Sequence, residues 1–382
     1  MFQLYSGDFV NRQLIFCYGG GFLKEIQRSI FALFIVFVFV QGGTDAQGVP
    51  QAQCPSTGGV DSPCVNILQC KVLLSVLRRR PIRPEAANRL RQLQCGFDGD
   101  KPKVCCPPSN LLPKLDECGE VTMPNKIVGG RNTDIAEFPW MALLEYTKPN
   151  GKDFHCGGSL ISARYVLTAA HCVRNPNINR RVRLTGVRLG EWDLSSARDC
   201  IGNDCTDPPV DIPIESTLIH ENYNMSDVSQ PNDIALLRLA YPVSFTDFIR
   251  PVCLPVISRI ASTQSFVGRD LTVVGWGNTG NATSSNVKQS VEVPGVSLAQ
   301  CRTTYEAFGA TITRDQLCAG GEAGRDSCRG DSGGPLLAVV GNNMFVVGIS
   351  SFGPTPCATE GWPGIYTNVA SYNSWISENI LP

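Results

Sequence analysis

Between Ile127 and the C-terminus, short apolar runs rich in Val, Ile, Leu and Phe recur between clusters of Gly, Pro, Asn and Asp. Runs of this kind, separated by turn-forming residues, predict many short antiparallel strands. A sustained helical period of 3.6 residues is found only at Val369–Ile380, which predicts a single terminal helix. The pattern therefore favours an all-β fold with a C-terminal helix.

Residues 54–106 have a different pattern. The amphipathic stretch Val72–Leu77 is followed by three arginines and Pro81, which predicts a short helix that ends before the proline. This region carries nine Lys or Arg and four Asp or Glu, a local excess of five positive charges. A solvated basic face would explain the excess, and so would a docking surface for the rest of the chain or for an acidic partner.

A linker is expected between these two regions, within residues 107–126. Its first part, Pro107–Leu115, contains three prolines. Proline fixes φ and removes a backbone donor, so a regular element is not expected to run through this part.

The N-terminal residues 1–46 resemble a leader. Ile30–Val40 is an eleven-residue apolar run that follows basic residues and precedes small residues ending at Ala46. This layout is typical of a secretory signal, and the run is too short to span a bilayer comfortably. We expect cleavage near Ala46 and no stable membrane insertion. The 29 residues before the run, which include Cys17, are unusually many, so a start downstream of Met1 and an uncleaved signal anchor both remain open.

The composition is that of a globular protein longer than one ordinary domain, with 382 residues, 43% hydrophobic and 18% charged. The formal net charge of −1 argues against a nucleic-acid partner. Seventeen cysteines are too many for a reducing compartment, and the paired spacings of zinc sites are missing from the sequence, so disulfides are expected. The six cysteines of residues 54–106 allow 15 pairings, which spacing alone does not resolve.

The chemistry is concentrated in a serine between glycines, Ser332, within Gly330-Asp331-Ser332-Gly333-Gly334-Pro335. A serine hydroxyl is a weak nucleophile until a base accepts its proton. His171, within Thr168-Ala169-Ala170-His171-Cys172, and Asp233, at the start of an apolar run, can supply the base and its partner. The chain order His, Asp, Ser is that of chymotrypsin-like enzymes and differs from that of subtilisins and α/β-hydrolases.

With the Ile127-Val128-Gly129-Gly130 segment, these motifs resemble the trypsin-like serine protease family over residues 127–382. The resemblance implies two six-stranded antiparallel β-barrels with the active site between them. It also implies that Ser332 attacks the scissile carbonyl, that His171 transfers the proton and that Asp233 orients the imidazole. The N–H groups of Gly330 and Ser332 would bind the developing oxyanion.

The resemblance also implies specificity for Arg or Lys before the scissile bond. Asp326 would lie at the base of the pocket, with Gly353 and Gly364 leaving its walls open. A surface aspartate is the alternative for Asp326. Two departures from the family pattern bear on the cleft, namely Phe352 where relatives often have Trp and Arg329 where they usually have Gln.

Residues 54–106 resemble the clip domain of arthropod protease zymogens, because the adjacent Cys105-Cys106 pair precedes two prolines. The clip pattern implies three pairings, and the protease pattern implies five more. These are Cys54–Cys105, Cys64–Cys95, Cys70–Cys106, Cys118–Cys253, Cys156–Cys172, Cys200–Cys205, Cys301–Cys318 and Cys328–Cys357. Loss of Cys17 with the leader would leave every cysteine paired.

Activation is expected by cleavage after Lys126. The new Ile127 amine would then pair with Asp331, and Cys118–Cys253 would keep the two pieces together. An acidic loop with Glu191, Asp193 and Asp199 resembles the Ca²⁺ loop of clip proteases, which adds a backbone oxygen near Ser196. A merely solvated acidic loop is the alternative.

Two glycosylation sequons begin at Asn224 and Asn281. Taken together, the motifs resemble a clip-domain serine protease zymogen of the group B type, secreted into arthropod haemolymph. Such a protein would act in melanization through prophenoloxidase, in Toll ligand processing or on another protease. Expected partners are protein substrates with Arg or Lys before the scissile bond, an upstream activating protease and serpin inhibitors. A catalytically inactive regulatory homologue, or a membrane-anchored binding protein with a protease-shaped body, is the alternative.

Overall fold

The computed structural model describes residues 54, 62–77, 82, 84–107, 111–121, 130–174, 182–277, 284–324 and 330–381. The chain divides into two compact units, Met1–Ser109 and Asn110–Pro382, and this boundary lies within the expected linker. The expected leader lies outside the described residues. Among the helices that are described, none is both long and apolar enough to cross a membrane.

The first unit is a small sheet stapled by disulfides. Three antiparallel strands pair in the order β1-β3-β2, and three helical segments accompany them. The elements are β1 (Cys64–Asn66), η1 (Ile67–Gln69), α2 (Lys71–Leu77), α3 (Pro84–Gln92), β2 (Gln94–Asp98) and β3 (Lys101–Cys105).

Helix α2 confirms the helix predicted before the arginines. The sequence pattern did not predict α3, whose buried Ala87 and Leu90 lie three residues apart on one helical face. The Cys54–Cys105, Cys64–Cys95 and Cys70–Cys106 disulfides match the expected clip pairings. A domain of this size has a small core, and each such staple contributes about 2–4 kcal/mol.

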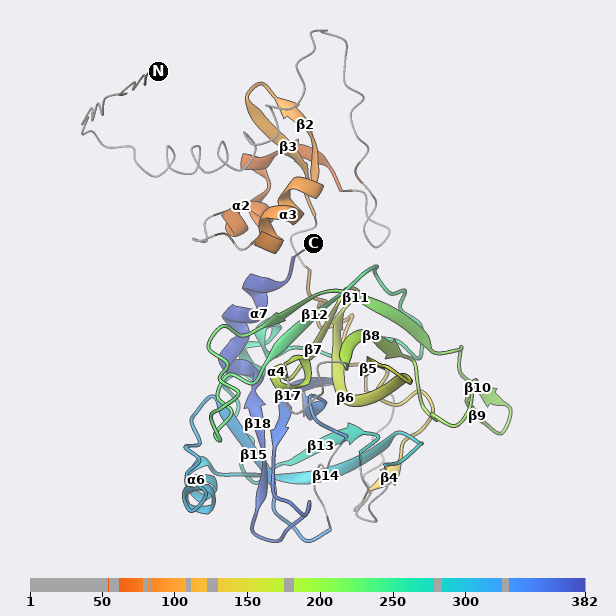
Figure 1. Cartoon of the computed structure of the whole chain (residues 1–382), viewed down its shortest axis with the longest axis vertical. Helices are drawn as coiled ribbons and strands as arrows, with labels where there is room; N and C mark the ends of the chain where they lie inside the picture. Colours follow the sequence, from red (N-terminus) through yellow and green to blue (C-terminus); the bar gives the residue numbers. More distant parts are fainter. Residues whose placement is uncertain are drawn as a thin grey trace, which may run out of the picture. The chain divides into compact units, whose positions relative to one another are not determined.

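The second unit contains two β-barrels (Figure 1). The first is closed in the order β11-β12-β7-β6-β5-β8. Its strands are β5 (Met141–Lys148), β6 (Gly151–Ser162), β7 (Tyr165–Thr168), β8 (Arg183–Leu189), β11 (Val210–Ile219) and β12 (Ala235–Leu239). Strands β7 and β12 are buried at every position, which explains why their sequences are mostly apolar, with Thr168 and Arg238 as the exceptions.

The second barrel has the order β13-β16-β17-β18-β15-β14 and is closed by pairing between β13 and β14, with the short β4 added beside β14. Its strands are β4 (Arg131–Asn132), β13 (Asp270–Gly275), β14 (Gln289–Val296), β15 (Gln316–Gly320), β16 (Pro335–Val340), β17 (Asn343–Phe352) and β18 (Pro363–Asn368). The expected fold of two six-stranded barrels is confirmed.

The expected C-terminal helix is present as the 3-10 turn η3 (Val369–Tyr372) followed by α7 (Asn373–Asn379). The expectation that it would be the only helix of this unit was wrong, since α4 (Ala170–Val173), α5 (Arg259–Thr263) and α6 (Leu298–Glu306) precede it. Local capping explains two of these. The Ser258 and Ser297 side chains accept N–H groups of α5 and α6, so the helices begin without a long apolar period.

Four expected disulfides of this unit are present among the described residues: Cys118–Cys253, Cys156–Cys172, Cys200–Cys205 and Cys301–Cys318. The Cys200–Cys205 bond closes a small hairpin of β9 (Cys200–Ile201) and β10 (Asp204–Cys205), which projects from the barrel in Figure 1. The Cys328–Cys357 pairing stays a prediction because Cys328 lies outside the described residues.

Candidate active site

Strand pairing brings His171 and Asp233 together. His171 follows β7 in the short helix α4, and Asp233 lies two residues before the start of β12. Strands β7 and β12 are antiparallel with Thr168 opposite Ala235, so the residues just beyond these positions meet at one edge of the barrel. The Nδ1 atom of His171 lies 2.7 Å from Oδ2 of Asp233, and the His171 backbone N–H donates to Oδ1 at 2.9 Å.

Asp233 is fully buried and has two further partners that the sequence did not reveal. The Ser351 hydroxyl donates to its Oδ2 at 2.5 Å, and the Thr367 hydroxyl donates to its backbone carbonyl at 2.7 Å. Burial by itself would raise the pKa of Asp233. The charge of His171 and the hydrogen bonds from His171 and Ser351 more than offset burial, so the pKa of Asp233 lies below its usual value.

The same pair changes the base strength of His171. Burial disfavours the charged imidazolium, but the adjacent Asp233 carboxylate favours it more strongly, so the pKa of His171 is raised above its usual value. The hydrogen bond to Asp233 also selects the tautomer with the proton on Nδ1, which leaves Nε2 free to accept a proton. His171 therefore has the properties of a general base.

Ser332 lies in a tight turn just before β16. Its carbonyl accepts the Gly157 N–H at 2.8 Å, and the next residue, Gly333, donates its N–H to Ser350 at 2.9 Å. Gly333 has φ +75°, and a Cβ there would lie 2.3 Å from the Thr168 hydroxyl oxygen, so the turn requires glycine. Within the described ranges no hydrogen bond joins the Ser332 hydroxyl to the His171 ring, and such bonds often tighten only when substrate binds.

The expected oxyanion donors Gly330 and Ser332 belong to this same turn. Gly330 has φ +106°, and a Cβ there would lie 2.9 Å from the Cα atom of Gly277. The Gly277 N–H in turn donates to Oδ1 of Asp331 at 2.9 Å. The Asp331 carboxylate is therefore held directly beside the turn that carries Ser332. Lys126 and Ile127 lie outside the described residues, so the expected pairing of Asp331 with the Ile127 amine stays a prediction.

The residues expected to form the walls of the specificity pocket lie just after β17, at Gly353, and within β18, at Gly364. A Cβ at Gly353 would lie 3.6 Å from the Cα atom of Gly364, so the two predicted wall residues are neighbours. The ring of Phe352 packs against Tyr305 of α6, and the Tyr305 hydroxyl donates to the Pro363 carbonyl at 2.7 Å. An aromatic cluster thus supports this side of the pocket. Asp326 and Arg329 lie outside the described residues.

The acidic loop buries two of its three carboxylates, those of Glu191 and Asp199. Oδ2 of Asp199 accepts the backbone N–H groups of Trp192 and Asp193, each at 3.0 Å, and its Oδ1 accepts the Ser196 hydroxyl. Burial and the nearby charge of Asp199 raise the pKa of Glu191. Glu191 also accepts a hydrogen bond from Arg188 at 3.2 Å, which offsets part of this repulsion, so the expected Ca²⁺ stays a prediction.

Lys288 adds a cation to this loop that the sequence did not indicate. Its side chain is buried, and it lies within electrostatic range of Glu137, Glu191 and Asp199. Burial lowers the pKa of Lys288 to about 8, although the three carboxylates oppose that shift. Lys288 thus already neutralises part of the negative charge of the loop.

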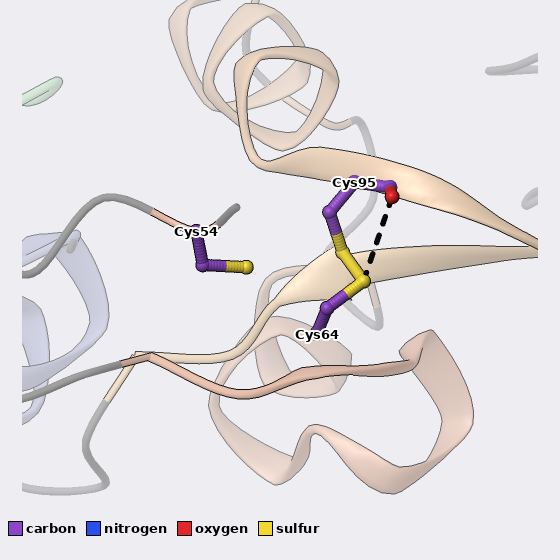
Figure 2. A group of neighbouring side chains, drawn as sticks. All are labelled: Cys54, Cys64 and Cys95. Carbon is purple, nitrogen blue, oxygen red and sulfur yellow. Dashed lines mark hydrogen bonds between the residues drawn. A yellow bond between two sulfur atoms is a disulfide. The ribbon is translucent and has the colours of Figure 1, made fainter. Parts of the chain in front are cut away.

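Two groups of side chains in the described residues are close enough to share an ion; neither belongs to the acidic loop, and both contain disulfide cysteines. Figure 2 shows Cys54, Cys64 and Cys95, of which Cys64 and Cys95 are bonded to one another, while Cys54 is bonded to Cys105. The second group, Cys156, His171 and Cys172, contains the Cys156–Cys172 bond and the triad histidine. A disulfide sulfur is not a thiolate ligand, so neither group is a metal site.

Of the two sequons, Asn224 is exposed, and its Oδ1 accepts the Ser226 N–H at 3.1 Å in a surface turn. Exposure of this kind is what glycosylation requires. Asn281 lies outside the described residues.

Comparison with known proteins places this site in a family. The trypsin model matches residues 127–376, and the model of the regulatory CLIP domain of proteinases matches residues 54–106. "Serine protease ea" of Drosophila melanogaster is 42% identical over 86% of this chain and 92% of its own length. Phenoloxidase-activating factor 1 of Holotrichia diomphalia is 44% identical over 87% and 94%. The crystal structure of Drosophila Grass, a clip serine protease of the Toll pathway, matches with a TM-score of 0.60 and 33% identity, covering 85% of this chain and 96% of Grass.

Proposed function

The chain belongs to the trypsin family of serine endopeptidases and carries a regulatory CLIP domain, and we propose that it is a secreted zymogen of an extracellular proteolytic cascade in arthropod haemolymph. One observation supports the catalytic part of this proposal. The buried Asp233 carboxylate is hydrogen-bonded to the His171 ring, and this pair lies at the barrel edge beside the turn that carries Ser332.

The proposed reaction begins with attack of the Ser332 hydroxyl on the scissile carbonyl while His171 accepts the proton. The N–H groups of Gly330 and Ser332 stabilise the oxyanion, a contribution of about 10²–10³ in rate for each donor. His171 then donates its proton to the leaving amine, and water releases the acyl group by the same sequence in reverse. Asp233 holds the imidazole in the required tautomer throughout.

Hydrolysis of a peptide with Arg before the scissile bond tests this assignment. We expect Ser332→Ala and His171→Ala each to abolish turnover of the activated protein, because the two residues act as a unit. The wild-type protein should also form a covalent ester with an organophosphorus inhibitor, which Ser332→Ala should not form. Full turnover in either variant would contradict the assigned roles.

The activation step rests on the Lys126–Ile127 sequence and on the position of Asp331. Cleavage after Lys126 would free an amine that pairs with the Asp331 carboxylate and so orders the adjacent oxyanion turn. The Cys118–Cys253 disulfide supports the proposal that the cut pieces stay together. The activating enzyme would itself be trypsin-like, since it cuts after lysine.

Two downstream roles are suggested by the relatives, one of which is named for phenoloxidase activation and one for the Toll pathway. We therefore propose protein precursors of melanization or of Toll signalling as substrates, with serpins as inhibitors. Incubation of the activated enzyme with prophenoloxidase, a Toll ligand precursor and a clip-protease zymogen, followed by N-terminal sequencing of the products, would identify the true substrate.

Calcium is proposed as a structural ion, held by Glu191, Asp199 and oxygens of the same loop near Asp193 and Ser196. It would neutralise the two buried carboxylates and order the loop, and it takes no part in bond cleavage. The alternative of a catalytically inactive homologue is disfavoured because Ser332, His171 and Asp233 are all retained.

A further inference from the structure

The loop that leads into Asp233, residues 222–232, is braced from within by its own polar side chains. Gln230 accepts the Tyr223 hydroxyl at 2.7 Å and donates to the carbonyl of Asp227 at 2.7 Å. Asn232 donates to the carbonyl of Asn222 at 3.1 Å. Gln230 and Asn232 also have positive φ values of 44° and 58°, which are uncommon for residues other than glycine. The loop therefore has a specific and partly strained shape that its contacts maintain.

One buried side chain from elsewhere in the chain holds this loop. Gln316, the first residue of β15, is 4% exposed and donates to the carbonyl of Ser229 at 2.8 Å. Its Oε1 accepts the N–H of Thr313 at 3.1 Å. The hydroxyl of Ser229, which is also buried, accepts the N–H of Thr311 at 2.9 Å. One hydrogen bond thus joins the 222–232 loop directly to residues 309–313, which follow α6, and Gln316 bridges the two segments with one bond to each.

Each of these two segments adjoins a residue that contacts the C-terminal end of β17, and this end of β17 lies beside the Ser332 turn, because Ser350 accepts the Gly333 N–H. Strand β17 pairs with β16 only as far as Ile349, opposite Pro335, whereas its pairing with β18 continues to Phe352. Among the described residues, no strand pairs with the β16 side of β17 beyond Ser350, so an extended peptide can add to this edge as a further strand. Ser351 binds Asp233 at the end of the loop, and Phe352 packs on Tyr305 of α6.

We propose that Gln316 is a positioning residue for substrate recognition, an inference that rests on the proposed protease activity. By joining the 222–232 loop to residues 309–313, it sets the spacing of the two segments that border a peptide paired with β17. The substrate residues affected are those two to four positions before the scissile bond. Gln316 would therefore control selectivity for these residues and not the preference for Arg or Lys.

Asp233 does not depend on this connection for its own position. It is held by the His171 N–H, the Ser351 hydroxyl and the Thr367 hydroxyl, all of which lie outside the 222–232 loop. Loss of the Gln316 bonds should therefore loosen the loop without moving the catalytic carboxylate. This separation distinguishes a positioning role from a general structural one.

The test compares two substrates with Gln316→Met, which keeps a similar side-chain length and loses both hydrogen bonds. The substrates are a blocked single-residue arginine amide and a tetrapeptide amide ending in arginine. We expect kcat/KM for the tetrapeptide to fall about tenfold, chiefly through KM, because a hydrogen bond contributes roughly that factor. The single-residue substrate should lose less than a factor of about two, since it does not reach the loop.

Gln300→Met is the matched control, because Gln300 is exposed on α6. This substitution should leave kcat/KM unchanged for both substrates. If Gln316→Met fails to fold, Ser229→Ala, which removes only the bond to Thr311, should still lower tetrapeptide turnover alone. Equal losses on both substrates, or no loss on either, would overturn the proposal. A wild-type protein that cleaves neither substrate after activation would instead contradict the proposed protease function.

Discussion

The hydroxyl of Ser351 donates to the same carboxylate oxygen of Asp233, Oδ2, that binds the imidazole of His171. The carboxylate is fully buried, so each of its hydrogen bonds lies in an environment of low dielectric constant, where such bonds are strong. Ser351 therefore stabilises the charged form of Asp233 in a place where water does not reach. The charged carboxylate in turn raises the pKa of His171.

The pH dependence of turnover should report this pair. The catalytic base is neutral His171, and its pKa is raised above the ordinary 6.5. We therefore expect kcat/KM to fall as the pH drops through a value above 6.5. Asp233→Asn should lower turnover by roughly 10⁴-fold and move the acid limb to lower pH, because the favourable charge is gone. The measurement is a pH profile of arginine-peptide hydrolysis.

Ser351→Ala serves as the control for that profile, since it keeps the Asp233 carboxylate. The acid limb of its profile should remain at a higher pH than that of Asp233→Asn.

The raised pKa of His171 also makes the stability of the folded state depend on pH, and this dependence has the opposite sense to that of activity. A raised histidine pKa stabilises the folded state at low pH, and this contribution is lost as the pH rises through the folded-state pKa.

Activation should depend on the Lys126–Ile127 bond. The Lys126→Ala protein, exposed to a trypsin-like activator, should stay uncut at this bond and inactive, because Asp331 gains no amine partner. In the uncut chain the Asp331 carboxylate accepts the Gly277 N–H, and only cleavage would add the positively charged Ile127 amine beside it. Cut wild-type protein should run as one band without reductant and as two bands with it, because of the Cys118–Cys253 disulfide. Full activity of Lys126→Ala would contradict this mechanism.

Calcium should raise the melting temperature if it binds the acidic loop. A ligand that binds only the folded state adds RT ln(1 + [L]/Kd), which is roughly 2.7 kcal/mol at a hundredfold excess over Kd. The measurement is thermal unfolding and autolysis with calcium and with chelator. Identical curves in both conditions would show that the loop is only solvated.

Lys288→Met should destabilise the protein, because Glu137, Glu191 and Asp199 would lose the buried cation near them. The loss should be smaller than the roughly 3–5 kcal/mol of a broken buried ion pair, because Glu137 and Glu191 keep Arg131 and Arg188 as partners. Denaturant unfolding measures the loss, and Lys114→Met is a suitable control because that lysine is exposed. A loss no larger than that of the control would mean that Lys288 does not compensate these carboxylates.

Specificity for Arg or Lys should depend on Asp326. A carboxylate at the base of a pocket loses its water when substrate enters, and a neutral substrate side chain leaves it unpaired at a cost on the order of 3–5 kcal/mol. Since 1.36 kcal/mol is about a factor of ten in rate, Arg peptides should exceed Phe peptides by at least several hundredfold in kcat/KM. Asp326→Ser should abolish this preference, and we expect Arg to exceed Lys by a small factor. A variant that still prefers Arg would show that another residue defines the pocket.

The sequence by itself was sufficient to predict those features of this protein that depend on local spacing and on family motifs. Alternating apolar runs and turn residues predicted the strands of both barrels, and the order of His171, Asp233 and Ser332 predicted the class of enzyme. The expected pairings of the clip cysteines agree with the structure. Helices α3, α4, α5 and α6 were not predicted, because helices of nine residues or fewer are too short to show a sustained helical period.

Only the tertiary structure identified the residues that support the site. Ser351 is 118 residues from Asp233 in sequence, and Gln316 is 87 residues from Ser229. A serine, glutamine or lysine looks the same in the sequence whether it lies on the surface or in the core. Its role depends on which distant segment packs against it. The closure of the two barrels brings these segments together and excludes water, and this makes Ser351, Gln316 and Lys288 partners of buried polar groups.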